Sequence, residues 1–228
     1  MKRALEMLEQ EGILLPSSVD ATWLTLGNVR TDMPNIGVDR RATWLEVAKL
    51  VLAGMGCPPQ HHPFHAMRCR QQTVAQAYAL MRERLIYCFS RGCDAHLSWQ
   101  ERALAFGSGL HTLQDSYCIG HCSRIDNGDP HSPIVDMHTY PSRQHPITTK
   151  RDAVWADEQQ TAFRADAAAA ITATVAALKI FVAQKATLIE PFLSQYVSIR
   201  ADIAEHLSII APKAPCFSDG DVGRLLMV

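Results

Sequence analysis

The residues best suited to chemistry in this chain are its histidines. Nine of its ten histidines lie between residues 61 and 145; apart from His96, they stand at positions 61, 62, 65, 111, 121, 131, 138 and 145. His111 and Asp115 are four residues apart, so on a helix their side chains emerge from one face and could close on one metal ion. His121 follows Gly120, which allows the chain to turn back toward the same helix end. An isolated pair at this spacing is more often a helical hydrogen bond, but the surrounding histidines favour a metal site.

Zinc is the metal that this set of residues suggests. Neutral imidazole and carboxylate are ligands that Zn²⁺ accepts, and catalytic zinc sites keep a coordination position for water. His65, in the segment HHPFHAMRC, is the next candidate, because it lies near the entrance of a predicted helix. His61 and His62 are expected at the surface or in support of the ligands. Cys118 and Cys122 could bind a soft metal, although simple packing is favoured.

Asp32 is a further candidate. It lies in GNVRTDMPNIG, residues 27–37, which glycine, asparagine and proline predict to be a loop just past a helix end. An aspartate in such a place is often only a turn or cap residue. Loops on rigid scaffolds are also where chemistry tends to lie, so Asp32 stays among the candidates.

The elements that must position these residues are predicted to be helices. Nearly every long segment repeats its apolar residues with a period of 3.6, and no run of alternating β-branched residues is convincing. The sequence predicts an all-α, single-domain bundle over residues 1–228, with the metal site at helix ends. The expected helices cover 2–11, a segment after Ser17-Ser18-Val19-Asp20, 39–55, 71–91, 99–117, 152–189 and 192–209, with a break at Glu190-Pro191 and a long irregular segment over 120–150.

Composition and charge limit the classes of function. The chain has 228 residues, 47% of them hydrophobic, and 22 Lys+Arg against 23 Asp+Glu. A nearly neutral protein has no basic field for polyanions, and no aromatic ladder is evident, so nucleic acid is not expected as a partner. No uninterrupted apolar run reaches the roughly 18 residues needed to span a bilayer. The apolar stripe around Ile171 and Val175 is expected in the core, with homodimerisation as an alternative.

The expected location is the cytoplasm. The start MKRALEMLEQEG alternates charged and aliphatic residues and does not resemble the apolar core of a signal peptide. The seven cysteines are odd in number and several fall within helical patterns. This favours buried thiols in a reducing compartment over a disulfide framework.

A resemblance to a known family extends this interpretation. The run 107–124, GSGLHTLQDSYCIGHCSR, resembles the HxxxDxxxxxH segment of the bacterial zinc-dependent phospholipase C superfamily, which also contains fungal single-strand-specific zinc nucleases. GNVRTDMP and HHPFHAM resemble two flanking segments of that family in the same order. The resemblance implies an all-helical fold and a cluster of two or three zinc ions that hydrolyses phosphate esters of a small or lipid-like substrate.

The resemblance also implies roles for individual residues. His65, His111 and Asp115 would hold one zinc, His121 would hold a second, and Asp32 would act as bridging ligand or general base. The family completes its second metal with a histidine and a following acid, for which His145 with Asp152 is preferred and His138 is the reserve. Arg124 and Arg143 are candidates for neutralising charge in the transition state. The family's third zinc uses the amino-terminal residue; here that ion would be missing or held by groups such as His61 or His62.

Three functions remain open from the sequence. The first is a metal-dependent hydrolase of phosphoric esters, in which two metals lower the pKa of bound water. The second uses the same scaffold as a zinc Lewis acid on a carbonyl-containing metabolite, for cyclisation or another biosynthetic step. The third is a non-enzymatic helical interaction protein whose histidines form a structural metal site or none. A fully coordinated metal would favour the third.

Overall fold

The computed structural model describes residues 1–32, 64–139, 154–157 and 160–205, and these are mainly helical. The helices are α1 (Lys2–Gln10), α2 (Ala21–Asp32), α4 (Val74–Gly92), α5 (Trp99–Asp115), α6 (Ala165–Ala183), α7 (Ile189–Tyr196) and α8 (Ala201–Ala204). A 3-10 turn, Ala186–Leu188, precedes α7. Strands β1 (Cys122–Arg124) and β2 (Ile134–Met137) form a small antiparallel sheet. The mainly α prediction is confirmed, and the predicted helix over 39–55 lies outside the described residues.

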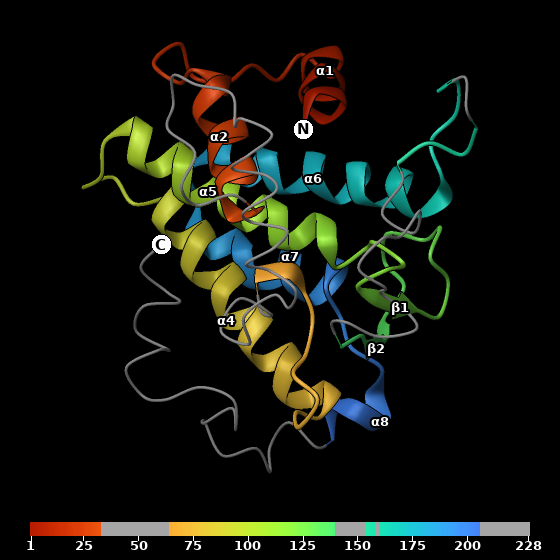
Figure 1. Cartoon of the computed structure of the whole chain (residues 1–228). Coiled ribbons are helices and arrows are strands. Elements are labelled where there is room, and N and C mark those ends of the chain that lie inside the picture. Colours follow the sequence, from red (N-terminus) through yellow and green to blue (C-terminus); the bar gives the residue numbers. More distant parts are fainter. Residues whose placement is uncertain (33–63, 140–153, 158–159, 206–228) are drawn as a thin grey trace, which may run out of the picture.

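Helix α5 lies at the centre of the molecule, with α2, α4 and α6 against it (Figure 1). Its first turn is fixed by a capping box, in which the Ser98 hydroxyl accepts from the Glu101 amide and the Glu101 carboxylate accepts from the Ser98 amide. Thr73 and Gln76 cap α4 in the same way. Both helices therefore begin where their sequences predict, within a few residues.

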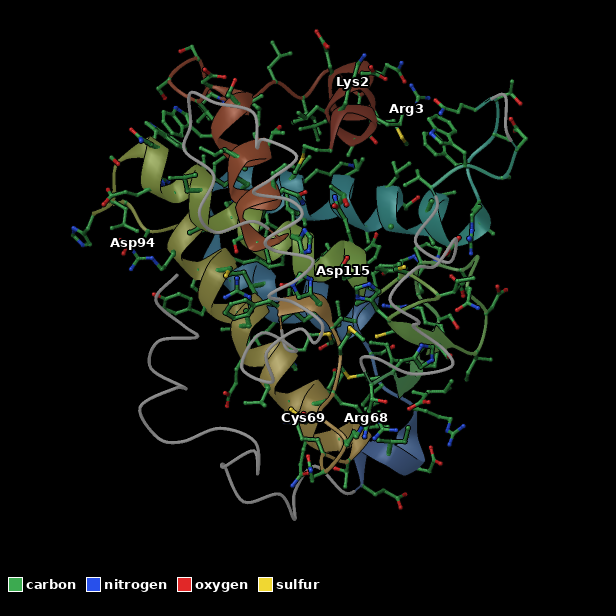
Figure 2. All side chains as sticks on the ribbon, viewed as in Figure 1. Lys2, Arg3, Arg68, Cys69, Asp94 and Asp115 are labelled. Atoms are coloured by element: carbon green, nitrogen blue, oxygen red, sulfur yellow. The ribbon has the colours of Figure 1, made fainter. Side chains whose placement is uncertain are left out.

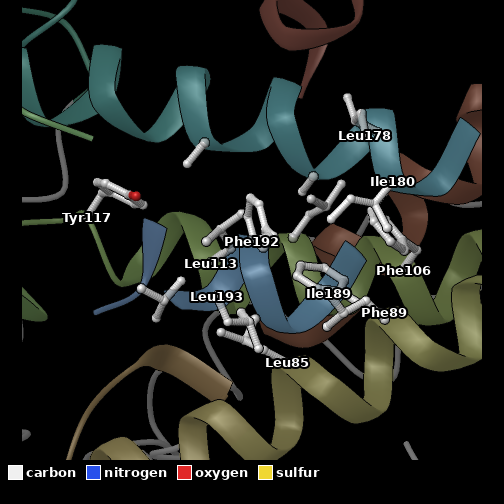
Figure 3. Packing of buried hydrophobic residues seen from close by; sticks show 14 of the residues in the cluster. Leu85, Phe89, Phe106, Leu113, Tyr117, Leu178, Ile180, Ile189, Phe192 and Leu193 are labelled. Atoms are coloured by element: carbon white, nitrogen blue, oxygen red, sulfur yellow. The ribbon is translucent and has the colours of Figure 1, made fainter. Parts of the chain in front are cut away.

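The core fills the space between α4, α5, α6 and α7. Figure 3 shows aromatic and aliphatic side chains from these four helices meeting there. The rings of Phe89 and Phe106 lie 4.5 Å apart, and those of Phe106 and Phe181 lie 4.9 Å apart. Val175, Leu178 and Phe181 are buried, as the sequence predicts for the apolar stripe of α6.

Helix α6 is long and apolar enough to cross a bilayer, with a mean hydropathy of 1.6. Its most apolar window is 56% buried inside the fold, however. A largely buried helix of this composition is typical of a protein core. It packs against both α1 and α5 (Figure 1).

Helix α2 corrects the prediction of a loop over 27–37, because it continues through Gly27 to Asp32. Gly27 and Gly107 are the points where α2 and α5 touch. A Cβ on Gly27 would lie 2.2 Å from the Leu104 carbonyl oxygen, and one on Gly107 would lie 2.1 Å from the Leu24 carbonyl oxygen. Gly27 is therefore a packing residue inside a helix. It does not end the helix, as the sequence had suggested.

The predicted C-terminal helices are corrected in their boundaries. Helix α6 begins at Ala165 and not at 152, because Asp157 folds the preceding chain into a turn by accepting from Thr161 and Ala162. The helix ends at Ala183, and the cap residue that follows, Gln184, has a left-handed φ of 54°. Glu190-Pro191 lies within the first turn of α7, where proline is tolerated because that amide has no helical partner.

Two further predictions are corrected in the middle of the chain. The segment after Gly120, expected to be irregular, contains β1 and β2, paired from Cys122 with Met137 to Arg124 with Ile134 across a bulge. Strands of three and four residues are too short to show an alternating pattern. Cys88, Cys93, Cys118 and Cys122 are free thiols, whereas Cys69 is disulfide-bonded, so the preference for thiols over disulfides is corrected at Cys69.

Candidate metal centre

Helix α5 supplies two of the candidate ligands. His111 lies one turn before the C-terminal end of α5, and Asp115 is its last residue. The imidazole Nε2 of His111 lies 3.1 Å from the Asp115 carboxylate oxygen Oδ2. Figure 2 shows Asp115 near the middle of the molecule, and both side chains are largely buried. The prediction that this i, i+4 pair shares one face of a helix is confirmed.

His65 reaches the same place from a turn that precedes α4. Its Nδ1 lies 3.0 Å from Asp115 Oδ2 and 3.2 Å from His111 Nε2. The Thr112 hydroxyl donates to the carbonyl of Phe64 at 2.8 Å, which holds this turn against α5. His65 lies nine residues before the first residue of α4, farther from the helix entrance than the sequence suggests.

His121 closes the other side of the group. Its Nδ1 donates to the carbonyl oxygen of His65 at 2.6 Å and lies 3.5 Å from Asp115 Oδ2. Metal-binding histidines commonly donate one ring N–H to a backbone carbonyl, which fixes the tautomer and directs the other nitrogen. His121 therefore supports the turn that carries His65, and in a neutral His121 this bond leaves the lone pair on Nε2.

The turn that carries His65 holds an unusual backbone conformation. Ala66 has a φ of 49°, in the left-handed region, and its side chain is buried. The Cys122 thiol donates to the Ala66 carbonyl, and burial raises the pKa of this thiol to about 12, so it is protonated at neutral pH. A non-glycine residue in this region persists where its surroundings hold it, and such residues cluster at functional sites. Cys122 thus serves the turn as a hydrogen-bond donor.

The three donor atoms of His65, His111 and Asp115 fit a small divalent metal. They form a triangle with sides of 3.0, 3.1 and 3.2 Å. Two ligands bound tetrahedrally at about 2.0–2.1 Å from zinc lie about 3.3 Å from each other. The triangle needs shifts of only a few tenths of an ångström to accept the ion, and a largely buried set of two imidazoles and a carboxylate suits zinc.

Asp115 is held in its ionised form. Burial would raise the pKa of this carboxyl, but His111 and His121 act against burial through their charge, and hydrogen bonds from His111 and His65 add to them. The pKa of Asp115 is thereby held well below its ordinary value. Protons on these imidazoles and a metal ion are alternative ways to balance the same buried carboxylate, so they compete for this site.

A cavity of about 250 Å³ opens beside the metal triad, between α1, α5 and α6. Asp115 and His121 lie on its α5 side. The opposite wall comes from α6, where Ala167, Ala170 and Ile171 line the cavity. Catalytic pockets are commonly apolar with a few convergent polar groups, which this cavity has.

The other predicted site residues fall into two groups. Asp32 is the last residue of α2. The hydroxyl of the preceding residue, Thr31, lies 2.8 Å from the hydroxyl of Ser108, which is one turn before His111 on α5. The side chain of Asp32 lies outside the described residues, as do His61, His62, Arg143, His145 and Asp152. His138 is described, and it serves the fold: its Nδ1 donates to the Gly120 carbonyl and its Nε2 lies 2.9 Å from the Ser123 hydroxyl.

Arg124 is also committed to the fold. It is buried and donates to the carbonyl oxygens of Ser116, Ser132 and Tyr196, with its guanidinium 3.8 Å above the Tyr117 ring. The prediction that Arg124 neutralises charge on a substrate is therefore corrected. Its contacts tie the end of α5 to the sheet and to α7, which holds the turn before His121 in place.

The residues that the sequence did not single out are those on the α6 side of the cavity. Gln114, next to Asp115, donates to Thr174 on α6 and accepts from Asn28 on α2. The only signal in the sequence is the row of small residues on α6 at positions 167, 170 and 174, which share one helical face.

Comparison with protein-family models, with curated proteins and with solved structures gave no match to this chain.

Proposed function

We propose that this protein is a metal-dependent hydrolase of phosphate esters, with zinc held by His65, His111 and Asp115. The observation that carries the proposal is the triangle of donor atoms, each 3.0–3.2 Å from the next, beside a cavity large enough for part of a substrate. The triad fills three positions and leaves room for a water or a substrate oxygen, as catalytic zinc sites require. Bound zinc supplies a Lewis acid for a phosphoryl oxygen and lowers the pKa of its water.

The residues of the chain have distinct parts in this proposal. Asp115 brings negative charge to the metal, and its low pKa keeps it available as a ligand at neutral pH. His121 orients the turn that carries His65 through its hydrogen bond to the His65 carbonyl. Asp32 remains the proposed general base, since α2 brings its backbone close to the α5 turn that precedes His111.

The proposed number of zinc ions stays at two or three. The described residues hold one triad. A second ion would use His121 together with His145 and Asp152, with Asp32 as a bridging ligand, which is the set that the family resemblance implies. Counting the ions therefore also tests whether those residues join the site.

The first test is the metal content of the purified protein at stoichiometric precision, followed by hydrolysis of p-nitrophenyl phosphate and bis-p-nitrophenyl phosphate. We expect zinc in at least an equimolar amount and activity that chelation removes and zinc restores. Protein that takes up no zinc when zinc is supplied would overturn the proposal.

A second candidate is a zinc Lewis acid acting on a carbonyl-containing metabolite. One observation favours it: among the described residues that line the cavity there is no lysine or arginine to bind a phosphate group. Zinc polarises a carbonyl without such a cation. Full zinc occupancy without hydrolysis of either phosphate ester would favour this candidate over the hydrolase.

A further inference from the structure

We propose that the cavity between α1, α5 and α6 binds an uncharged organic group of about six to ten carbon atoms, which forms part of the substrate, and that Ala170 limits the size of this group. This inference deepens the proposed function and rests on it for the position of the reacting end of the substrate. It concerns a separate set of residues, however, and these can be tested without a metal.

The walls of the cavity determine the chemistry that it accepts. Ala4 of α1 and Ala167, Ala170 and Ile171 of α6 present methyl and methylene groups. Asp166 also lines the cavity, and Arg164 donates to its carboxylate at 3.1 Å, so the charge of Asp166 is already balanced. A wall of this kind gains from burying an apolar group.

The polar groups on the α5 side are already paired with the protein. The Gln114 amide donates to the Thr174 hydroxyl at 3.2 Å, and the Thr174 hydroxyl donates to the Ala170 carbonyl at 2.7 Å. The first of these bonds links α5 to α6 beside the cavity. Asp115, at the end of α5, and Cys118 and His121, which follow it, are the other polar residues on this side, so this side of the cavity is suited to a metal-bound group and the α6 side to hydrocarbon.

The volume of the cavity limits the part of a substrate that it can enclose. An apolar cavity of about 150 Å³ accommodates benzene, and pockets for drug-sized ligands begin near 300 Å³. A cavity of about 250 Å³ lies between these limits. It encloses a single ring or a short branched chain, and because it is open to solvent on one side, the rest of a longer substrate would extend out of it.

The small side chains on one face of α6 explain why the cavity exists. Ala167, Ala170, Ile171 and Thr174 recur at three- and four-residue spacing, so they share one face of the helix. Three of these four positions carry a small side chain, which keeps α6 from filling the space above Asp115. Replacing Ala170 with leucine should fill part of the cavity, while leucine is nearly as good a helix former as alanine.

The first experiment measures binding of methylphosphonate, phenylphosphonate and 4-biphenylylphosphonate to the zinc-loaded protein by calorimetry. Each buried methylene-sized group improves binding about fourfold, so phenylphosphonate should bind at least about tenfold more tightly than methylphosphonate. The biphenylyl compound should gain little further, because its second ring would extend beyond the enclosed part of the cavity. Equal affinity for all three compounds would overturn the proposal.

The matched variants are Ala170→Leu and Ala168→Leu. Ala168 lies on the exposed side of the same helix, so its leucine leaves the cavity unchanged. We expect Ala170→Leu to bind phenylphosphonate no better than methylphosphonate, and Ala168→Leu to behave as the unchanged protein. Zinc content and melting temperature establish that both variants fold. Phenylphosphonate binding within twofold of the unchanged protein in a folded Ala170→Leu variant would overturn the role of Ala170.

A measurement on the metal-free protein separates this inference from the proposed function. Benzyl alcohol should shift the NMR signals of the Ala170 methyl and the Thr174 methyl, and Ala170→Leu should weaken this binding at least fivefold. If benzyl alcohol binds there and no phosphonate binds the zinc-loaded protein, the cavity is supported and the hydrolase proposal fails. If phosphonates bind without size discrimination and benzyl alcohol shifts neither signal, the cavity proposal fails and the metal site stands.

Discussion

Asp115 is the residue on which the candidate metal centre depends. Its Oδ2 atom lies within 3.5 Å of nitrogen atoms from His65, His111 and His121, which come from three different parts of the chain. A largely buried carboxylate is costly unless it is paired. Three imidazoles converge on one carboxylate oxygen. The folded protein must therefore balance the charge of this carboxylate, either with protons on the imidazoles or with a bound metal ion.

Removal of a ligand should remove the metal. We expect His111→Ala and Asp115→Asn each to weaken zinc binding by more than about 100-fold, since even supporting residues cost 10–100-fold. Helical content should be retained, because the core between α4, α5, α6 and α7 is not touched. Elemental analysis and far-UV circular dichroism measure both quantities.

His131→Ala is the control for these variants, because His131 is exposed and contacts Tyr196 instead of the triad. It should keep its zinc. Unchanged zinc content in both His111→Ala and Asp115→Asn would show that the ion lies elsewhere.

The lowered pKa of Asp115 predicts a dependence of stability on pH in the metal-free protein. Because the folded-state pKa lies below the ordinary value of 3.8, the ionised carboxylate stabilises the fold fully above about pH 4. That stabilisation is lost as the pH falls through the lower folded-state pKa. The free energy of unfolding of the unchanged protein, compared with Asp115→Asn, should thus fall as the pH is lowered below about pH 4. A difference that stays constant over this range in urea titrations would contradict the prediction.

At the scale of elements, the contact between α2 and α5 sets the position of Asp32 relative to His111. The two helices touch at Gly27 and Gly107, and Asn28 and Thr31 bond to Gln114 and Ser108 on α5. No side chain can be inserted at the glycines without moving backbone. The closeness of these helices is what brings the end of α2 toward the metal triad.

Gly107→Ala tests this contact. Alanine is about 1 kcal/mol better than glycine inside a helix, but a Cβ 2.1 Å from the Leu24 carbonyl forces the helices apart, at a cost of about 1–3 kcal/mol or more. Since the carbonyl cannot yield as a flexible side chain would, we expect a net loss of about 2 kcal/mol in the free energy of unfolding. Urea denaturation measures it.

Gly128→Ala is the matched control, because its Cβ would approach nothing closer than 3.3 Å. Its free energy of unfolding should change by less than about 0.5 kcal/mol. Equal stability of the two variants would mean that α2 and α5 can separate without cost.

At the scale of the whole molecule, the metal centre joins segments that are distant in sequence. His65 precedes α4, His111 and Asp115 end α5, and His121 precedes β1. An ion that binds these residues only when the chain is folded must stabilise the folded state. Its removal should therefore be visible in the stability of the entire protein.

Zinc at 100 times its dissociation constant should add about 2.7 kcal/mol of stability. For a chain of this length, each kcal/mol raises the melting temperature by about 2–4 °C, so the expected shift is about 5–11 °C. Differential scanning calorimetry of the metal-free and zinc-loaded protein measures it. His111→Ala should lose this zinc-dependent shift; a variant that retains it would place the stabilising ion at another site.

The disulfide bond of Cys69 bears on the cellular location of the whole molecule. Disulfides persist in oxidising compartments and are rare in the cytosol. The cysteine content therefore no longer supports a cytoplasmic location, which the sequence had suggested.

The sequence by itself determined the helical class of the fold and the pair of candidate ligands on α5, His111 and Asp115. Helical periodicity and the caps at Asp20, Thr73 and Ser98 are local properties, so α1, α4 and α5 and the start of α2 could be predicted closely. The spacing of His111 and Asp115 fixes their common face for the same reason. His65 and His121 were candidates from their neighbourhood, but their distances to Asp115 could not be derived.

Only the tertiary structure decided the features that depend on contacts between distant segments. In the sequence Gly27 suggests the end of a helix, but in the structure it packs against Leu104 inside α2. Arg124 suggests a surface cation, but in the structure it donates to the carbonyl oxygens of Ser116, Ser132 and Tyr196. The cavity is the clearest case, because empty space between α1, α5 and α6 has no signature along the chain. Periodicity reports which face of a helix is apolar, whereas packing decides what that face meets.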